Sequence, residues 1–349
     1  EGEDGDRIWA MQFGTAAWED VYEIVVDARG HVFVVGETGG SLGSEHLGLF
    51  DAFVLELDSA GVQGRVLRFG TAETDAALGV AFAADGDLVV VGVAGEALAG
   101  AVSAGFGDAF AMKLTPALEE VWTHQFGTMG TDMAQGVALA PDGDLVVVGS
   151  AGAMLGDAYH GGVDAFVRRL DPDGAPRWTR QLGTGAYDRG FGVAVAPGGR
   201  IHVSGISLGD LVTGGVGAGE EDVFVVTLQA TGATLWTKMI ASPESDRAYS
   251  HRHLAVDAEG DLWIVGDTRS SVIPGRSQQG NGDAFVLKLD EDGETVWGRA
   301  LATEWFECGA AVALDDDGFG YVVGGTDGLL SRVDDDALGP DAFVRKVGP

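Results

Sequence analysis

The segment Ser250-His251-Arg252-His253 contains the one His-x-His pair in the sequence. In an extended chain, residues two apart point to the same side, so both imidazoles could bind one divalent cation. Glu307, in the loop of the next repeat, completes a candidate metal site of His251, His253 and Glu307. If the protein is an enzyme, His253 is the candidate general base, with Glu307 or Asp246 as its acidic partner. The alternative is a polar loop whose histidines have no chemical role.

A second group of candidates combines aromatic rings with carboxylates in loops that follow Gly-Thr or related corners. Flat aromatic faces suit sugars, which stack on them, and organic cations, which are attracted by cation–π interaction. Four repeats that would be consecutive in a ring carry such aromatic residues, so we expect one arc of binding groups. The alternative is that the rings only cover the loops. The predicted ligand-binding residues are Trp18, Glu19, Tyr187, Asp188, Tyr249 and Trp305.

Recognisable enzyme motifs are absent from the sequence. It contains no nucleophile elbow, Walker loop, zincin helix or dinucleotide fingerprint in the required context. We therefore expect a binding or interaction module for a small molecule, a glycan, a cation or a protein partner. A hydrolase or lyase that uses the same site is the alternative, and the only cofactor we consider is a divalent cation.

These candidates are positioned by a block that recurs six times. Its clearest marker is an Asp followed by Ala or Val and then Phe, and successive copies are 56 to 61 residues apart. The copies begin at Asp51, Asp108, Asp164, Asp222, Asp283 and Asp341. A fixed period of this length is the signature of a repeat architecture.

Each block is predicted to form four β-strands. In the third block, Asp144 is followed by an unbroken apolar run at residues 145–148, typical of a strand that is buried on both faces. Residues 171–174 read Asp-Pro-Asp-Gly, in which proline and glycine favour a tight turn before the next strand. Helical periodicity is absent, so we predict an all-β protein, a six-bladed β-propeller of four-stranded antiparallel blades.

The two ends of the chain are complementary in this pattern. The sequence begins with a fourth-strand motif at residues 8–13 and ends with a third-strand motif at residues 341–347. We expect residues 8–13 to complete the last blade, formed by residues 310–347, and so to close the ring and remove two exposed sheet edges. The prediction is thus a single domain of residues 1–349.

The motif D-A-F-V-x-K-L-D-x-D-G, followed by W-x-x-x-x-G, resembles the bacterial SBBP-type β-propeller repeats. Residues 283–293 show the first motif and residues 178–183 the second, and the resemblance covers essentially the whole chain. The family name implies seven blades, whereas this chain offers six. For function, the resemblance implies an extracytoplasmic surface or binding module without a shared catalytic set.

Two acidic positions recur in all six blocks. One is the Asp that opens each third strand, and the other lies four residues after each Gly-Thr corner or its equivalent, as in Asp75 and Asp132. They could form a ring that binds a cation, or each could accept backbone N–H bonds and fix its own loop. Both positions are expected on the end of the blades that carries the long second-to-third loops, such as residues 36–51, and we call this end the long-loop face. The recurring tryptophans, as in Trp122, are expected to wedge between blades.

Composition limits the partners. The formal charge of −33 argues against nucleic acid and anionic membrane surfaces as partners. No run of eighteen apolar residues is present, so we expect no membrane insertion. The single cysteine, Cys308, excludes an internal disulfide. We expect an extracellular, cell-surface or periplasmic location.

Overall fold

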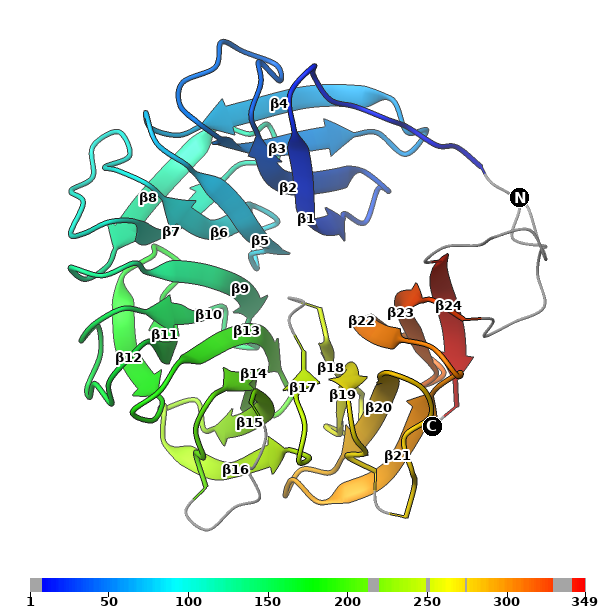
Figure 1. Cartoon of the computed structure of the whole chain (residues 1–349). Helices are drawn as coiled ribbons and strands as arrows, with labels where there is room; N and C mark the ends of the chain where they lie inside the picture. The colour runs from blue at the N-terminus through cyan, green and yellow to red at the C-terminus, as the bar shows by residue number, and fades with distance from the viewer. Residues whose placement is uncertain (1–7, 213–219, 249–251, 274, 329–340, 349) are drawn as a thin grey trace. The chain divides into compact units, whose positions relative to one another are not determined.

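The computed structural model describes residues 8–212, 220–248, 252–273, 275–328 and 341–348. The described residues form 24 β-strands and no helix, and no segment among them could cross a membrane as a helix. The strand pairings that the structure describes within the sheets are antiparallel, and Figure 1 labels the strands. The predicted all-β class is confirmed.

The chain divides into two compact units, residues 1–139 with 171–175, and residues 140–170 with 176–349. The first unit contains two complete four-stranded sheets and the strand β9 (Met133–Leu139). The first sheet is β1 (Glu19–Val26), β2 (Val32–Thr38), β3 (Asp51–Leu57) and β4 (Gln63–Phe69). The second is β5 (Ala76–Phe82), β6 (Leu88–Ala94), β7 (Asp108–Leu114) and β8 (Glu120–Phe126).

The second unit contains the remaining strands. The third sheet has the order β12-β11-β10-β9, with β10 (Leu145–Ala151), β11 (Asp164–Leu170) and β12 (Pro176–Leu182). The fourth is β13 (Asp188–Val195), β14 (Ile201–Ser207), β15 (Asp222–Leu228) and β16 (Thr234–Ile240). The fifth is β17 (Asp246–Arg247), β18 (Leu254–Val256), β19 (Leu262–Thr268), β20 (Asp283–Leu289) and β21 (Thr295–Leu301). The last is β22 (Glu307–Leu314), β23 (Gly320–Thr326) and β24 (Asp341–Val347).

Each sheet is one copy of the sequence repeat, and the protein is a six-bladed β-propeller. Third strands begin at the Asp-Ala-Phe or Asp-Val-Phe motif in all six copies. The apolar second strand of the third blade is fully buried at Leu145–Val148, because both of its faces are covered. In the last blade, Tyr321 and Val323 of the second strand are partly exposed. Turns of the Asp-x-x-Gly type join strands where a positive φ is needed, as at Gly174 with φ 82°.

Neighbouring sheets within each unit share apolar cores. In the first unit, Phe33 and Val54 of the first sheet pack in one cluster with Val80 and Phe110 of the second. The indole of Trp122 donates a hydrogen bond to the carbonyl of Pro172 at 3.3 Å, which links the second sheet to the next hairpin turn. The predicted role of the recurring tryptophan, a wedge between successive blades, is therefore confirmed for this residue.

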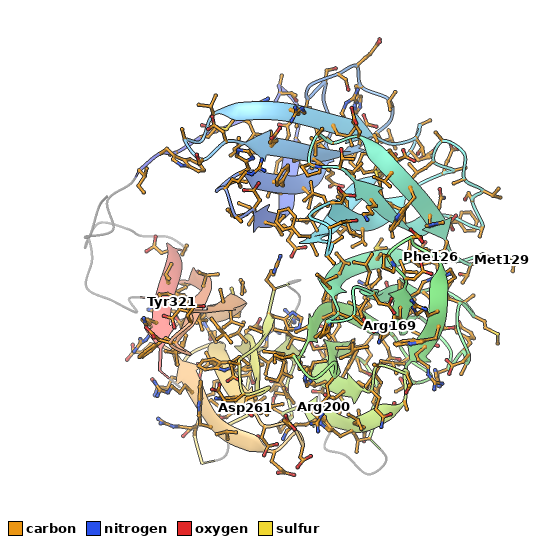
Figure 2. All side chains as sticks on the ribbon, turned by 180° about the vertical axis from the view of Figure 1, so that it is seen from behind. Phe126, Met129, Arg169, Arg200, Asp261 and Tyr321 are labelled. Atoms are coloured by element: carbon orange, nitrogen blue, oxygen red, sulfur yellow. The ribbon has the colours of Figure 1, made fainter. Side chains whose placement is uncertain are left out.

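The turn face, opposite the long-loop face, is fixed by ion pairs. The basic residue in the third strand pairs with aspartates of the turn between the first and second strands of the same blade. Arg169, which is labelled in Figure 2, donates to Asp144 at 2.8 Å and also pairs with Asp142. Lys288 repeats this arrangement with Asp257 at 2.9 Å and Asp261 at 3.1 Å. The repeated lysine of the motif thus serves the scaffold.

The fifth blade differs at its innermost strand. Other inner strands contain a register shift, for instance between Gly190 and Gly192, at the position where the fifth repeat has its insertion. There the strand is broken into β17 and β18, which both pair with β19. The candidate His253 immediately precedes β18 and therefore lies at this break.

Residues 8–13 form no named strand, and the last sheet has three strands among the residues that the structure describes. The segment nevertheless packs as a fourth strand does. Trp9 lies against Gly61 of the first hairpin turn, just as Trp122 lies against Gly174 and Trp236 against Gly293. The pairing of residues 8–13 with β24 would join the two units, and it stays a prediction, as does the single domain.

Candidate functional site

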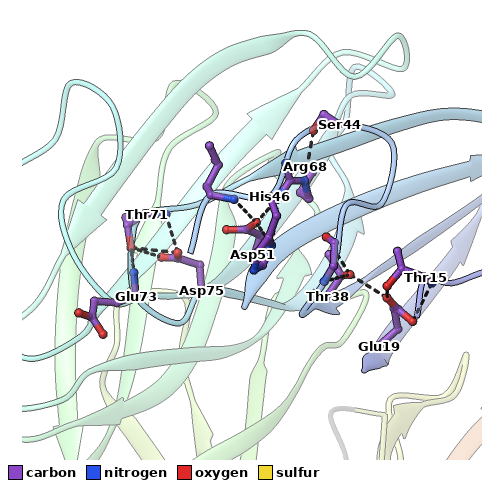
Figure 3. A network of polar contacts seen from close by, with 12 residues as sticks. Thr15, Glu19, Thr38, Ser44, His46, Asp51, Arg68, Thr71, Glu73 and Asp75 are labelled. Carbon is purple, nitrogen blue, oxygen red and sulfur yellow. Dashed lines mark hydrogen bonds and ion pairs between the residues drawn. The ribbon is translucent and has the colours of Figure 1, made fainter. Parts of the chain in front are cut away.

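The corner acids fix their own loops. The carboxylate of Asp75 accepts hydrogen bonds from the backbone N–H of Thr71 at 2.6 Å, from its hydroxyl at 2.9 Å and from Gly95 N–H at 3.0 Å (Figure 3). Asp132 and Thr128 repeat this geometry at 2.6 and 2.9 Å. These acids are fully buried, so their first role is to hold the loop.

Four of the strand-opening aspartates fix the long loops in a similar way, namely Asp51, Asp108, Asp164 and Asp283. Each of these four accepts a backbone N–H from the residue four positions earlier, at 2.9 Å from Leu47 to Asp51 and 2.7 Å from Ala104 to Asp108. The amide of Gln125 adds a bond to Asp108 at 3.0 Å. In the first blade an arginine, Arg68, takes the position of this glutamine and pairs with Asp51 (Figure 3).

The two carboxylates of a blade junction meet at the corner glycine. A Cβ added to Gly127 would lie 2.3 Å from Asp108 Oδ1 and 3.0 Å from Asp132 Oδ2, and Gly183 has the same surroundings. The glycine of the repeat is therefore required by close approach of side chains. Among the described residues, no three His, Cys, Asp or Glu side chains group as a metal site. The acids thus meet in pairs, and each pair serves the backbone.

Burial raises the pKa of some of these acids. Removal from water raises the pKa of Asp188, and the nearby Asp164 adds to the rise. Burial likewise raises the pKa of Asp75, with a contribution from Asp51. Asp267 in β19 lies outside these two acidic positions, and burial raises its pKa to about 6.

The predicted aromatic contacts lie at the surface. Trp18, Tyr187 and Trp305 are 66%, 51% and 58% exposed. The Trp18 indole donates a hydrogen bond to Asp20 at 2.8 Å, and the guanidinium of Arg189 lies 6.0 Å from the centre of the Tyr187 ring. Each ring is thus free to stack on a ligand while its loop is fixed.

The predicted carboxylate contacts are less available than these rings. Asp188 is fully buried and bonded to Thr184 N–H at 2.6 Å. Glu19 is bonded to the Thr15 hydroxyl at 2.5 Å and to Thr38 at 3.0 Å (Figure 3). Tyr249, the remaining predicted contact, lies outside the described residues.

Each of the candidate acid–base residues that the structure describes is hydrogen-bonded to its own, different partners. His253 is fully buried and its Nε2 is bonded to the Ser204 hydroxyl, between the fourth and fifth sheets. Glu307 is fully buried and accepts bonds from Thr303 N–H at 2.7 Å and Thr326 at 2.9 Å. Asp246 is also buried and accepts a bond from Ser242 N–H at 2.5 Å. His251 lies outside the described residues, and so the metal site remains a prediction.

Two cavities in the first unit were not anticipated from the sequence. One, of about 610 Å³, is polar and lies between residues 12–15 and 41–43, with Glu19 in its wall. The other, of about 550 Å³, lies beside Phe106, which is 88% exposed. The corner loops of the second and third blades, residues 71–75 and 128–132, contain no aromatic residue. Phe106, flanked by glycines in the long loop, was the signal that could have identified this second cavity.

Comparison with known proteins supports the fold and goes no further. No known family model and no curated protein match the chain, so the resemblance to SBBP-type repeats is not shown. A periplasmic gluconolactonase of Pseudomonas aeruginosa, PpgL, has 14% identity and a TM-score of 0.50, over 93% of this chain and 87% of its own. An ulvan lyase of polysaccharide lyase family PL25 has 11% identity and a TM-score of 0.50, over 86% and 78%. At these identities the likeness concerns the propeller fold alone.

Proposed function

We propose that this protein is an exported carbohydrate-binding module that recognises a neutral glycan or polyol on its long-loop face. The observation that supports this most directly is the set of exposed aromatic rings on fixed corner loops, at Trp18, Tyr187 and Trp305. Rings that are already ordered lose little entropy when a sugar stacks on them. A neutral ligand is favoured because the chain carries a net charge of −33, which repels anions.

Fold-level comparison is compatible with this proposal. The gluconolactonase and the polysaccharide lyase described above are named for carbohydrate substrates, and the first is named as periplasmic. Because fold similarity alone does not transfer activity, the substrate class rests on the exposed rings. The exported location rests on the resemblance of the repeats.

A binding role is favoured over an enzyme by the state of the candidate catalytic groups. His253, Glu307 and Asp246 are each fully buried and bonded to neighbouring hydroxyl or amide groups. A general base has to reach the proton that it removes. None of these three groups is placed to meet a ligand on the surface.

The test is titration of neutral and uronic-acid oligosaccharides, with calorimetry and tryptophan fluorescence as readouts. We expect saturable binding of a neutral oligosaccharide, weakened about three- to tenfold by Trp305→Ala or Trp18→Ala. Phe106→Ala is the control, because it removes an exposed ring outside the predicted set. The proposal fails if no neutral sugar binds, or if the control weakens binding as much as the tryptophan variants do.

A further inference from the structure

The cavity beside Phe106 belongs to the long-loop face of the first unit and is separate from the predicted aromatic contacts. It has a volume of about 550 Å³ and lies between the corner loop and long loop of the second blade and the corner loop of the third. Pockets of this size hold small molecules. Its main lining side chains are Glu73, Val93, Glu96, Phe106, Thr131 and Met133.

The charge in this cavity is entirely negative. Glu73 and Glu96 are exposed, and neither side chain has an ion-pair partner among the residues that the structure describes. The lining includes no lysine, arginine or histidine. Two unneutralised carboxylates in a concave site attract a cation, because the low-dielectric walls concentrate their field.

The same cavity offers apolar surface. The Phe106 ring is 88% exposed, and the side chains of Val93 and Met133 also line the space. An aromatic face attracts an ammonium group, and a methionine side chain adapts to irregular apolar ligands. Neither a metal ion nor a neutral sugar would use all of these features.

The walls of the cavity are held by hydrogen bonds. Gly95 N–H donates to Asp75 at 3.0 Å, and the Gln125 amide donates to the Glu96 carbonyl at 2.9 Å. On the other side, Asp132 N–H donates to the Gly107 carbonyl at 2.8 Å. The buried acids of the corner loops therefore preorganise this cavity, which lowers the entropy cost of binding.

We propose that this cavity binds a small organic ammonium ion with an apolar body. The carboxylates of Glu73 and Glu96 supply the charge, and Phe106 contacts the cation or the apolar body. The proposal names a second ligand site, and it does not depend on carbohydrate binding at Trp18, Tyr187 and Trp305.

The experiment compares three probes of one shape, benzylamine, benzyl alcohol and benzoate, by calorimetry and saturation-transfer NMR at about physiological salt. We expect saturable binding of benzylamine only. Glu73→Gln, Glu96→Gln and Phe106→Ala should each weaken it about threefold, and the triple variant at least tenfold. Trp305→Ala should leave it unchanged, which separates this site from the proposed glycan site.

Glu45→Gln is the control for net charge, because Glu45 is exposed on the long loop of the first blade, outside this cavity. If this variant weakens benzylamine as much as Glu73→Gln does, the attraction is general and the proposal is wrong. Equal binding of benzyl alcohol would also overturn it. Calcium binding that depends on Glu73 and Glu96 but not on Phe106, without benzylamine binding, would replace it with a metal site.

Discussion

Asp267 should make the stability of this protein fall as the pH rises through the weakly acidic range. The residue lies in β19, opposite Arg247 in β17, and is 8% exposed. Burial raises the pKa of Asp267 to about 6, from an ordinary value of 3.8. Arg247 and Arg269 lower this pKa, while Asp246 and Glu221 raise it, so the net effect is that of burial.

The sign and size of the effect follow from proton linkage. Between pH 4 and 6 the folded chain holds a proton on Asp267 that the unfolded chain has lost. The stabilisation is therefore fully present below about pH 4 and is lost as the pH rises through about 6. A rise of about two pKa units corresponds to about 3 kcal/mol of unfolding free energy.

The assay is denaturant unfolding of the parent and of Asp267→Asn at pH values from 3 to 8, followed by tryptophan fluorescence. Asparagine keeps the size of the side chain but cannot lose a proton. We expect the stability of the parent relative to Asp267→Asn to fall by about 3 kcal/mol between pH 3 and pH 7.

Asp292→Asn serves as the control, because it removes one charge from an exposed turn in the same blade. Its difference from the parent should stay nearly constant over this range. A constant difference for Asp267→Asn as well, or one of opposite sign, would refute the reasoning about burial.

Three further predictions concern the scaffold. Deleting residues 1–15 should expose a sheet edge and cause aggregation or a large fall in Tm in size-exclusion and thermal-melt assays, and an equally stable, monomeric product would contradict ring closure. Raising the NaCl concentration from low to moderate should raise Tm, because salt screens the repulsion among the charges of a chain with a net charge of −33. The Debye screening length is about 10 Å at 0.1 M ionic strength. A Tm that stays flat or falls would contradict this prediction. Gly127→Ala should lower the free energy of unfolding, measured with denaturant, by about 1–3 kcal/mol, because the added Cβ would lie 2.3 Å from Asp108 Oδ1. Gly198→Ala, which has open space around it, should lower it by less than about 1 kcal/mol. Equal effects of the two substitutions would contradict the close-packing argument.

Sequence periodicity was sufficient to predict the strands. Third strands begin at the predicted aspartates, as at Asp51 and Asp283, because the motif places a turn or loop before the aspartate and alternating apolar residues after it. The insertion in the fifth repeat was visible in the sequence. Its consequence, a break between β17 and β18, was not, because strand pairing depends on the neighbouring strand β19.

Candidate site residues were predicted less completely. The sequence identified Trp18, Tyr187 and Trp305 as aromatic residues of the corner loops, and their exposure agrees with a contact role. It also grouped His253 with Glu307 as a candidate acid–base set. In the structure, His253 is bonded to Ser204 of the preceding blade, a contact between residues 49 positions apart that no local pattern encodes.

The sequence by itself determined the repeat, the strand class and the blade number, because each of these depends on residues that are close together in the chain. Tertiary structure decided the use of each polar group. The acids recur at the same positions of each repeat, yet only packing shows that Asp108 and Asp132 meet at Gly127 and hold the backbone. The cavity beside Phe106 is likewise formed by loops from two blades, Glu73 and Glu96 from one and Met133 from the next. Such a site has no sequence signature, because its walls come together only when the blades pack.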